Sequence, residues 1–140
     1  MVKYYKIKKS SNPKKETAWK NFSKYIRIRD AIKTTGTPDY AQCITCGNVF
    51  TIEDMDAGHG LAGRANSILF NEEIVNAQCR WCNRGNGGEL QAYKMILLER
   101  YGQDKWDMWE SMKRKHIDFS QFDYEQISRV YRLKTKELLK

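Results

Sequence analysis

The spacing of apolar residues predicts amphipathic helices toward both ends of the chain. Over residues 16–34, large apolar residues recur at every third or fourth position, which is the period of a helix with one buried face. These residues are Trp19, Phe22, Tyr25, Ile26 and Ile32. Another face of the same helix carries the basic residues Lys20, Lys24 and Arg27. The aromatic residues are interpreted as core, and the basic stripe either as phosphate contacts or as a solvated surface.

Helical periodicity returns after residue 88. One helix is expected over 89–101, where Leu90, Tyr93, Leu97 and Tyr101 share a side, and another over 105–115. A last helix is expected to begin near Asp123, in a segment that resembles a capping box. Its inward positions would include Ile127 and either Val130 or Tyr131, and it presents a second basic stripe of Arg129, Arg132 and Lys136.

The middle of the chain has short β-prone runs instead. Residues 49–52 and 55–59 are expected to pair as a hairpin, and residues 67–70 to form a further short strand. The predicted fold class is therefore α+β, with a small β-containing core and flanking amphipathic helices at both ends.

Composition divides the chain into three parts. Residues 1–15 are predicted to be a flexible basic arm, because aliphatic residues are few and Pro13 is expected to break any helix. Residues 16–102 are assigned to one domain, and residues 103–140 to a helical extension packed on or beside it. No signal-like segment and no run of about 18 apolar residues is present, so we expect a cytoplasmic protein that does not cross a membrane.

Charge is unevenly distributed around the formal net charge of +8. Residues 1–33 hold eleven lysines and arginines against two acidic residues, whereas residues 34–104 hold five against nine. Basic residues again outnumber acidic ones after residue 104. This clustering favours a polyanion such as DNA or RNA as a partner, and the alternative is a solvated basic surface.

The four cysteines form two pairs with identical spacing, Cys43 with Cys46 and Cys79 with Cys82. A two-residue gap lets one tight turn direct both sulfurs at a single ion, and Gly47 follows the first pair as a residue that tolerates positive φ. In a reducing compartment this pattern indicates a structural zinc site, with a redox dithiol or plain buried thiols as the alternatives.

A resemblance to a known family rests on the residues between and around these pairs. The chain has CxxC, a β-prone segment ending in Gly58-His59, a loop with Gly63-Arg64, and a second CxxC followed directly by Asn83. This order resembles the HNH (ββα-metal) endonucleases with a four-cysteine zinc knuckle. More closely, residues 19–102 are similar to the phage NinG family, also called Rap.

The resemblance implies a metal-dependent endonuclease that cuts branched recombination intermediates, such as Holliday junctions, D-loops and forks, in a bacterial host cell. His59 would be the general base, since a neutral imidazole can take a proton from water. Asn83 and Asp56 would bind a catalytic Mg²⁺ or Mn²⁺. Arg64 would grip the scissile phosphate or pair with a carboxylate, and Arg84 would contact DNA.

Two positions depart from the wider HNH pattern, and other functions stay open. Gly58 stands where many members have an acidic residue or histidine that binds the metal, and Ile74 stands where they have asparagine, with Asn76 nearby. Glu72 and Glu73 are alternative ligands. His59 could be an ordinary loop histidine, and the chain a non-catalytic zinc module or an RNA-directed nuclease. A homodimer would suit paired incisions in a four-way junction.

Overall fold

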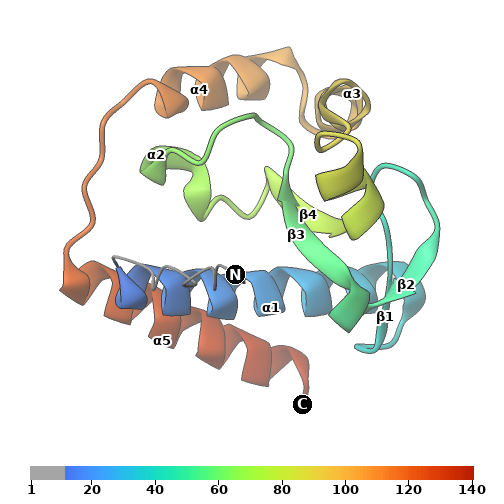
Figure 1. The fold of residues 1–140 in the computed structure, drawn as a ribbon, viewed down its shortest axis with the longest axis horizontal. Coiled ribbons are helices and arrows are strands. Elements are labelled where there is room, and N and C mark those ends of the chain that lie inside the picture. Colours follow the sequence, from blue (N-terminus) through green and yellow to red (C-terminus); the bar gives the residue numbers. More distant parts are fainter. Residues whose placement is uncertain (1–11) are drawn as a thin grey trace, which may run out of the picture.

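The structure is a computed structural model that describes residues 12–140. Helices and two small antiparallel sheets make up these residues (Figure 1). In chain order the elements are α1 (Pro13–Thr35), β1 (Tyr40–Gln42), β2 (Val49–Thr51), η1 (Ile52–Asp54), β3 (Met55–His59), α2 (Asn66–Leu69), β4 (Val75–Cys79), η2 (Trp81–Gly85), α3 (Leu90–Tyr101), α4 (Gln103–Lys113) and α5 (Gln121–Leu138). Over residues 12–140, none of the helices combines the length and apolar character that crossing a membrane requires.

Helix α1 begins earlier than the sequence pattern predicts. Pro13 lies in its first turn, where proline lacks only an N–H group that would have no partner within the helix. Asn12 caps the helix by accepting a hydrogen bond from the backbone N–H of Lys15 (3.2 Å). The expectation that Pro13 breaks a helix is therefore wrong, and Lys14 and Lys15 belong to α1. The rest of the expected arm, residues 1–11, lies outside the described residues.

The strands pair differently from the predicted hairpin. Strand β2 pairs with β1, and β3 pairs with β4, with Asp56 opposite Gln78 and His59 opposite Val75. The 3-10 turn η1 separates β2 from β3 and carries the chain from one sheet to the other. The sequence pattern predicted no strand over residues 75–79, where β4 lies and where Asn76 and Gln78 are polar. Both are buried, at 4% and 0% exposure, and β4 is covered along its whole length.

Residues 67–70 also differ from expectation, since they contribute to the short helix α2 and not to a strand. The backbone N–H of Ile68 donates to the carbonyl of Ala65, which starts this turn. The side chain of Asn71 then accepts hydrogen bonds from the backbone N–H groups of Glu73 and Ile74. These local bonds satisfy the backbone without a sheet partner and return the chain to β4.

The β3–β4 pair lies between two groups of helices (Figure 1). On one side α1 packs on the strands, with α5 alongside it, and Phe22 and Ile26 contact Ala57 and Val75. On the other side α3 and α4 contribute to a second cluster that contains the buried residues Ile74, Tyr93, Leu97, Trp106 and Trp109. The tryptophans of α4 are therefore core residues. In α5, Tyr131 is buried and Val130 is exposed.

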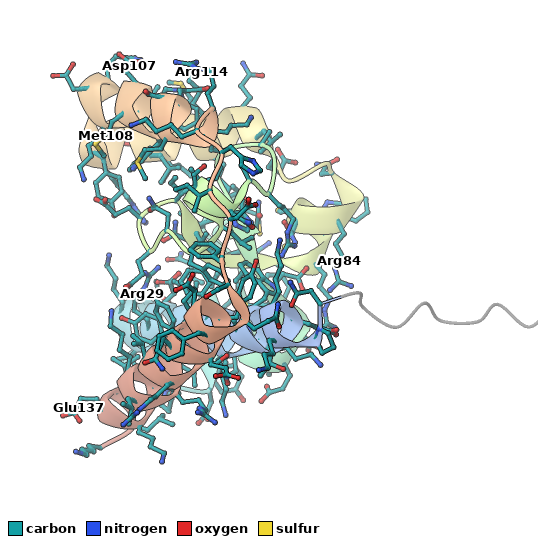
Figure 2. All side chains as sticks on the ribbon, turned by 90° about the vertical axis from the view of Figure 1, so that its left-hand side faces the viewer. Arg29, Arg84, Asp107, Met108, Arg114 and Glu137 are labelled. Atoms are coloured by element: carbon teal, nitrogen blue, oxygen red, sulfur yellow. The ribbon has the colours of Figure 1, made fainter. Side chains whose placement is uncertain are left out.

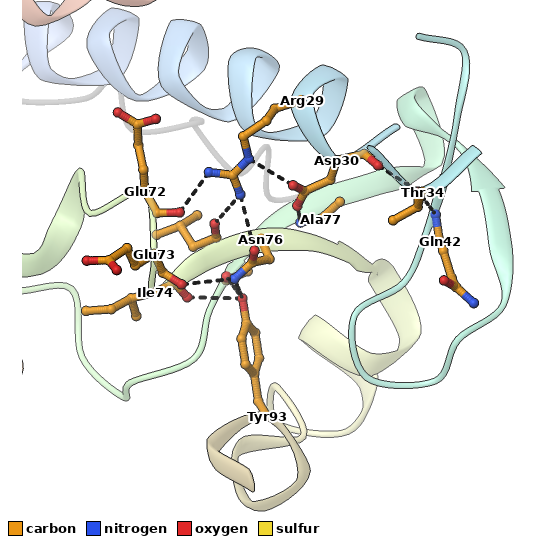
Figure 3. Close-up of polar contacts among 12 residues, drawn as sticks. Arg29, Asp30, Thr34, Gln42, Glu72, Glu73, Ile74, Asn76, Ala77 and Tyr93 are labelled. Carbon is orange, nitrogen blue, oxygen red and sulfur yellow. Dashed lines mark hydrogen bonds and ion pairs between the residues drawn. The ribbon is translucent and has the colours of Figure 1, made fainter. Parts of the chain in front are cut away.

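A buried polar network fixes β3 and β4 against α1 and α3 (Figure 3). The carboxylate of Asp30 on α1 accepts hydrogen bonds from the Ala77 backbone N–H (2.7 Å) and from Arg29 (2.9 Å). Arg29 also donates to the carbonyl oxygens of Glu72 and Val75. From α3, the Tyr93 hydroxyl donates to the Gly58 carbonyl (2.7 Å), directly before His59. The network thus sets the position of the strand that carries His59.

Replacing Asp30 with alanine is expected to lower the free energy of unfolding by about 3 kcal/mol, because it leaves a buried N–H group and a half-buried guanidinium without their acceptor. Denaturant unfolding measures this change. Asp107 provides the matched control, because it lies on the outer side of α4, away from Arg29 (Figure 2). Asp107→Ala is expected to change the free energy by less than about 0.5 kcal/mol. Equal effects of the two substitutions would show that the network does not stabilise the fold.

Candidate functional site

The four cysteines converge where the turn after β1 (residues 43–47, here called the knuckle) meets the end of β4 and the start of η2. Their Sγ atoms all lie within 4.8 Å of one another, and those of Cys46 and Cys79 are 3.9 Å apart. Four sulfurs at about 2.3 Å from a tetrahedral zinc are about 3.8 Å apart, so the arrangement fits this ion. None of the four thiols is in a disulfide. Zinc held by four thiolates has no open position for water, so the site is suited to structure and not to catalysis.

The local backbone explains this convergence. The N–H of Gly47 donates to the Cys43 carbonyl, and Gly47 adopts φ of 77°, which closes the first turn as expected. Backbone N–H groups of Cys79 and Cys82 donate to the sulfurs of Cys43 and Cys79. Burial raises the pKa of the Cys43 thiol, but N–H donors from the backbone of Cys46 and Cys79 outweigh it and lower that pKa to about 6. The turn is therefore arranged to hold at least one thiolate.

His59 ends β3, and two contacts orient its imidazole ring. Its Nε2 lies 3.1 Å from the carbonyl oxygen of Leu69. Because a carbonyl only accepts, Nε2 carries the proton and Nδ1 is left as the acceptor. The imidazole stacks on the indole of Trp19, with ring centroids 5.1 Å apart and planes 17° from parallel. The contacts hold a neutral histidine in the tautomer that can accept a proton at Nδ1.

The pKa of His59 is lowered to about 4. Burial is the largest cause, the nearby charge of Arg64 adds to it, and the hydrogen bond to Leu69 opposes it. The imidazole is thus neutral near pH 7.

This lowered pKa makes stability depend on pH. In the unfolded chain His59 has its ordinary pKa of about 6.5, so as the pH falls the unfolded state takes up the proton first. The stabilising contribution is complete above about pH 6.5 and is lost as the pH falls toward about 4. The wild type is expected to lose about 1.5 kcal/mol more than His59→Gln between about pH 7 and pH 5. Denaturant unfolding of both proteins measures this difference, in which the shared effect of pH on the cysteines cancels. Parallel pH profiles would contradict the assignment.

A small cavity of about 190 Å³ lies next to Trp19 and the outer edge of β3. It is lined by Trp19, Ser23, Asp56, Ala57, Arg64, Asn83 and Arg84. His59 is not among these lining residues, and Trp19 connects it to them through the ring stack. The arrangement brings the predicted residues Asp56, Asn83 and Arg64 to one cavity.

The carboxylate of Asp56 is the centre of polar contacts at this cavity. Arg84 holds it with two hydrogen bonds of 2.8 Å, and the Asn83 amide donates to it at 3.0 Å. The oxygen and nitrogen of an amide exchange places when the group turns by 180°, so Asn83 can also present oxygen on this side. A carboxylate and an amide oxygen together are a donor set that suits Mg²⁺ or Mn²⁺. In this structure Arg84 and Asn83 occupy the Asp56 carboxylate, so a divalent cation at these two residues would require Arg84 to move away.

Arg64 lies over the indole of Trp19, with its guanidinium carbon 4.5 Å from the ring centroid. Arg64 was expected either to grip the phosphate or to pair with a carboxylate. Within residues 12–140 it forms no ion pair with a carboxylate. Its guanidinium reaches the cavity from the loop after β3. Arg64 is thereby placed to meet an anion there.

Packing in this structure explains why residue 58 is a glycine. A Cβ atom at this position would lie 2.1 Å from Oε1 of Gln78, whose side chain crosses β3 from the neighbouring strand. Gln78 in turn donates to the hydroxyl of Thr45 in the knuckle and to the carbonyl of Gly88. An acidic residue at position 58 would collide with this side chain. The departure from the HNH pattern follows from the packing of Gln78.

The remaining predicted residues have different surroundings. Lys20, Lys24, Arg129, Arg132 and Lys136 are exposed on α1 and α5. Arg27 is half-buried, and it donates to the Ile52 carbonyl (2.8 Å) and the Ser23 carbonyl, which indicates a structural role. The alternative ligands Glu72 and Glu73 bind Lys134 and Lys105. Asn76 is buried and bonded to Tyr93.

Trp19 is the site residue that the sequence pattern did not reveal. Its position in the apolar repeat of α1 indicates core, and the helix does bury neighbouring residues such as Ala18 and Phe22. The indole itself is only half-buried, and it contacts both His59 and Arg64. Periodicity alone cannot separate a core aromatic from one that supports a site, because both lie on the same helical face.

Comparisons with known proteins agree on one family. The family model described as "Bacteriophage Lambda NinG protein" matches residues 1–140. The protein named ninG of Escherichia phage lambda is 37% identical over 75 residues, which are 53% of this chain and 36% of that protein. The protein ninG of Salmonella phage P22 is 33% identical over 97 residues, 69% of this chain and 47% of that protein. The chain thus matches less than half of the length of these relatives. No solved structure matches it significantly.

Proposed function

This chain belongs to the NinG family of phage lambda-like proteins, and from that premise we propose that it is a divalent-metal-dependent endonuclease that cuts branched DNA. The observation that carries the proposal is a neutral His59 with Nδ1 as its acceptor and with the charge of Arg64 near it, since Arg64 also lines a cavity together with Asp56 and Asn83. The order β3, β4 and helical turn η2 supports it, since Asn83 follows the second cysteine pair on η2 as in a ββα-metal site.

In the proposed reaction, Nδ1 of His59 takes a proton from the attacking water while the Leu69 carbonyl holds Nε2–H. With a pKa of about 4, the imidazole is a weak base in the free protein. A phosphate anion in the cavity offsets the charge of Arg64 and favours the imidazolium form, so DNA binding raises this pKa. Arg64 donates hydrogen bonds to the phosphate oxygens.

Asp56 and Asn83 would hold the divalent cation, which supplies positive charge against the charge that builds up on the phosphate and the leaving oxygen. In the free protein the Arg84 guanidinium neutralises Asp56 instead. With a cation at Asp56, Arg84 would be released, and its side chain, already 66% exposed, would be able to contact the DNA backbone. The exposed basic residues of α1 and α5 would add further phosphate contacts.

A non-catalytic zinc module that binds nucleic acid is the second candidate. The observation that favours it is the pairing of Asp56 with Arg84 and Asn83, which satisfies the carboxylate without a cation. In that case Arg84 would stay bonded to Asp56. Divalent cations would not change the affinity for nucleic acid and would not cause the DNA to be cut.

A cleavage assay separates the nuclease from the zinc module. The zinc-loaded protein is incubated with labelled four-way junctions, forks and linear duplexes, and with an RNA fork of the same sequence. Each substrate is tested with Mg²⁺, with Mn²⁺ and with Ca²⁺. We expect incision of the branched DNA with Mg²⁺ or Mn²⁺ and little or none of the linear duplex. Salt-sensitive binding without incision of any substrate would support the zinc module. Preferential incision of RNA would change the substrate class.

A further inference from the structure

Trp81 is the most exposed large hydrophobic side chain within residues 12–140, at 69% exposure. It lies between the cysteines of the second pair, at the start of η2. The other three tryptophans are buried or half-buried. Neither the zinc site nor the proposed cleavage chemistry uses this indole.

The indole is held in place although it is exposed. A Cβ atom at Gly85 would lie 2.7–3.2 Å from three atoms of its six-membered ring, so the ring rests against the backbone of Gly85. The Trp81 carbonyl accepts a hydrogen bond from the Asn86 N–H (2.9 Å), which closes the turn under the ring. Cys82, the next residue, is buried in the four-cysteine cluster. The support on one side leaves an aromatic surface that is already oriented before anything binds.

The surroundings of Trp81 suit a nucleic acid. Arg80, directly before η2, and Arg84, on η2, flank it in sequence, and their side chains are 49% and 66% exposed. Arg84 and Asn83 from the same turn line the candidate cavity. A helix with its side chains is about 10 Å wide, which is about three base steps of 3.4 Å along one DNA strand. One strand can therefore place a phosphate beside Asn83 and a base over Trp81.

We propose that Trp81 stacks on an unpaired or terminal base at a DNA branch point, and that this contact makes the protein prefer branched over linear DNA. The inference rests on the proposed function, since it assumes that DNA is the substrate. Aromatic stacking with a base is favourable for any base, because each has a π-face. In a linear duplex the bases are already stacked on their neighbours, so contact with Trp81 requires that one be pulled out. At a fork or an open junction, the base pair next to the branch has one face that no neighbouring pair covers.

The test measures binding in Ca²⁺, with 2-aminopurine placed at the branch of a four-way junction and, in parallel, inside a linear duplex. Stacking on an indole quenches the fluorescence of this base. The variants are Trp81→Ala, the conservative Trp81→Phe, and Phe122→Ala as the control. Phe122 is 65% exposed on α5, so its removal deletes a similarly exposed ring elsewhere. Zinc content and the thermal midpoint confirm that each variant is folded.

Trp81→Ala is expected to abolish the quenching and to weaken junction binding by about 5- to 100-fold, with linear duplex binding unchanged. Trp81→Phe is expected to keep most of the quenching, and Phe122→Ala all of it. Equal loss of binding to both DNAs, or no loss, would overturn the proposal. Because binding is read without incision, the two proposals fail separately. A wild type that quenches but never cuts in Mg²⁺ contradicts only the nuclease, and cutting with an unchanged junction preference in Trp81→Ala contradicts only the stacking role.

Discussion

Replacing His59 with alanine is expected to lower the rate of phosphodiester cleavage by about 100- to 10,000-fold, which is the range that a positioned general base contributes. The expectation follows from the tautomer, since Nε2–H is committed to the Leu69 carbonyl and Nδ1 is left to accept the proton of water. The rate is measured in a single turnover at saturating junction DNA with Mg²⁺. Binding of the same DNA in Ca²⁺ is expected to change little.

His116 provides the control for this substitution. Its side chain is 85% exposed and pairs with Asp118 on the loop before α5. His116→Ala is expected to cut at the wild-type rate. If His59→Ala retains the wild-type rate with zinc bound and the fold intact, His59 is not the base, and the site must be assigned again.

Removal of zinc is expected to have the second large effect, a loss of at least about 5 kcal/mol of folding free energy, which is comparable to the whole stability of many small domains. Few buried apolar side chains surround the cysteines, so packing alone would hold these segments together only weakly. Apart from the cysteines, the buried members of the cluster are Met55 and three alanines, and Phe50 and Ile52 pack against it while only partly buried. Without the ion, little else would hold the four thiols together, and β1, β4 and η2 would lose the contact that joins them.

Thermal unfolding with and without a zinc-selective chelator measures this effect, and Cys79→Ser provides the matching variant. Cys79 ends β4, and its sulfur accepts the Cys82 N–H, so its loss disturbs both the sheet and η2. We expect the chelated protein and Cys79→Ser to unfold at much lower temperature, and added Zn²⁺ to restore only the wild type. An unchanged midpoint after the zinc has been removed would show that the cysteines are ordinary buried thiols.

The sequence predicted the parts of this molecule that depend on local spacing. Two CxxC pairs determine which sulfurs can meet, and the apolar period of α1 indicates the face that is buried in the structure. Strand pairing depends on long-range contacts and was predicted poorly. Strand β4 is the clearest example, because Arg29 and Tyr93 bond to the side chain of Asn76, and the amide of Gln78 donates to Thr45 and to the Gly88 carbonyl. Neither set of partners is adjacent in sequence.

The candidate site was likewise predictable only in part. His59, Asp56 and Asn83 were recognised by their positions relative to the cysteines, and the structure brings Asp56 and Asn83 into contact. The reason for Gly58 lies in the side chain of Gln78, twenty residues later, and so could not be found from local spacing. The same holds for Trp19, whose role is visible only once β3 is packed on α1.

The most direct test of the metal-dependent nuclease is a cleavage assay in two steps. Zinc-loaded wild-type protein is first bound to a four-way junction in Ca²⁺, and an excess of Mg²⁺ is then added. We expect the strands to stay intact until Mg²⁺ is added and then to be cut near the branch. The His59→Ala protein is expected to bind the junction without cutting it. A junction that remains bound and uncut by the wild type in both Mg²⁺ and Mn²⁺ would contradict the account.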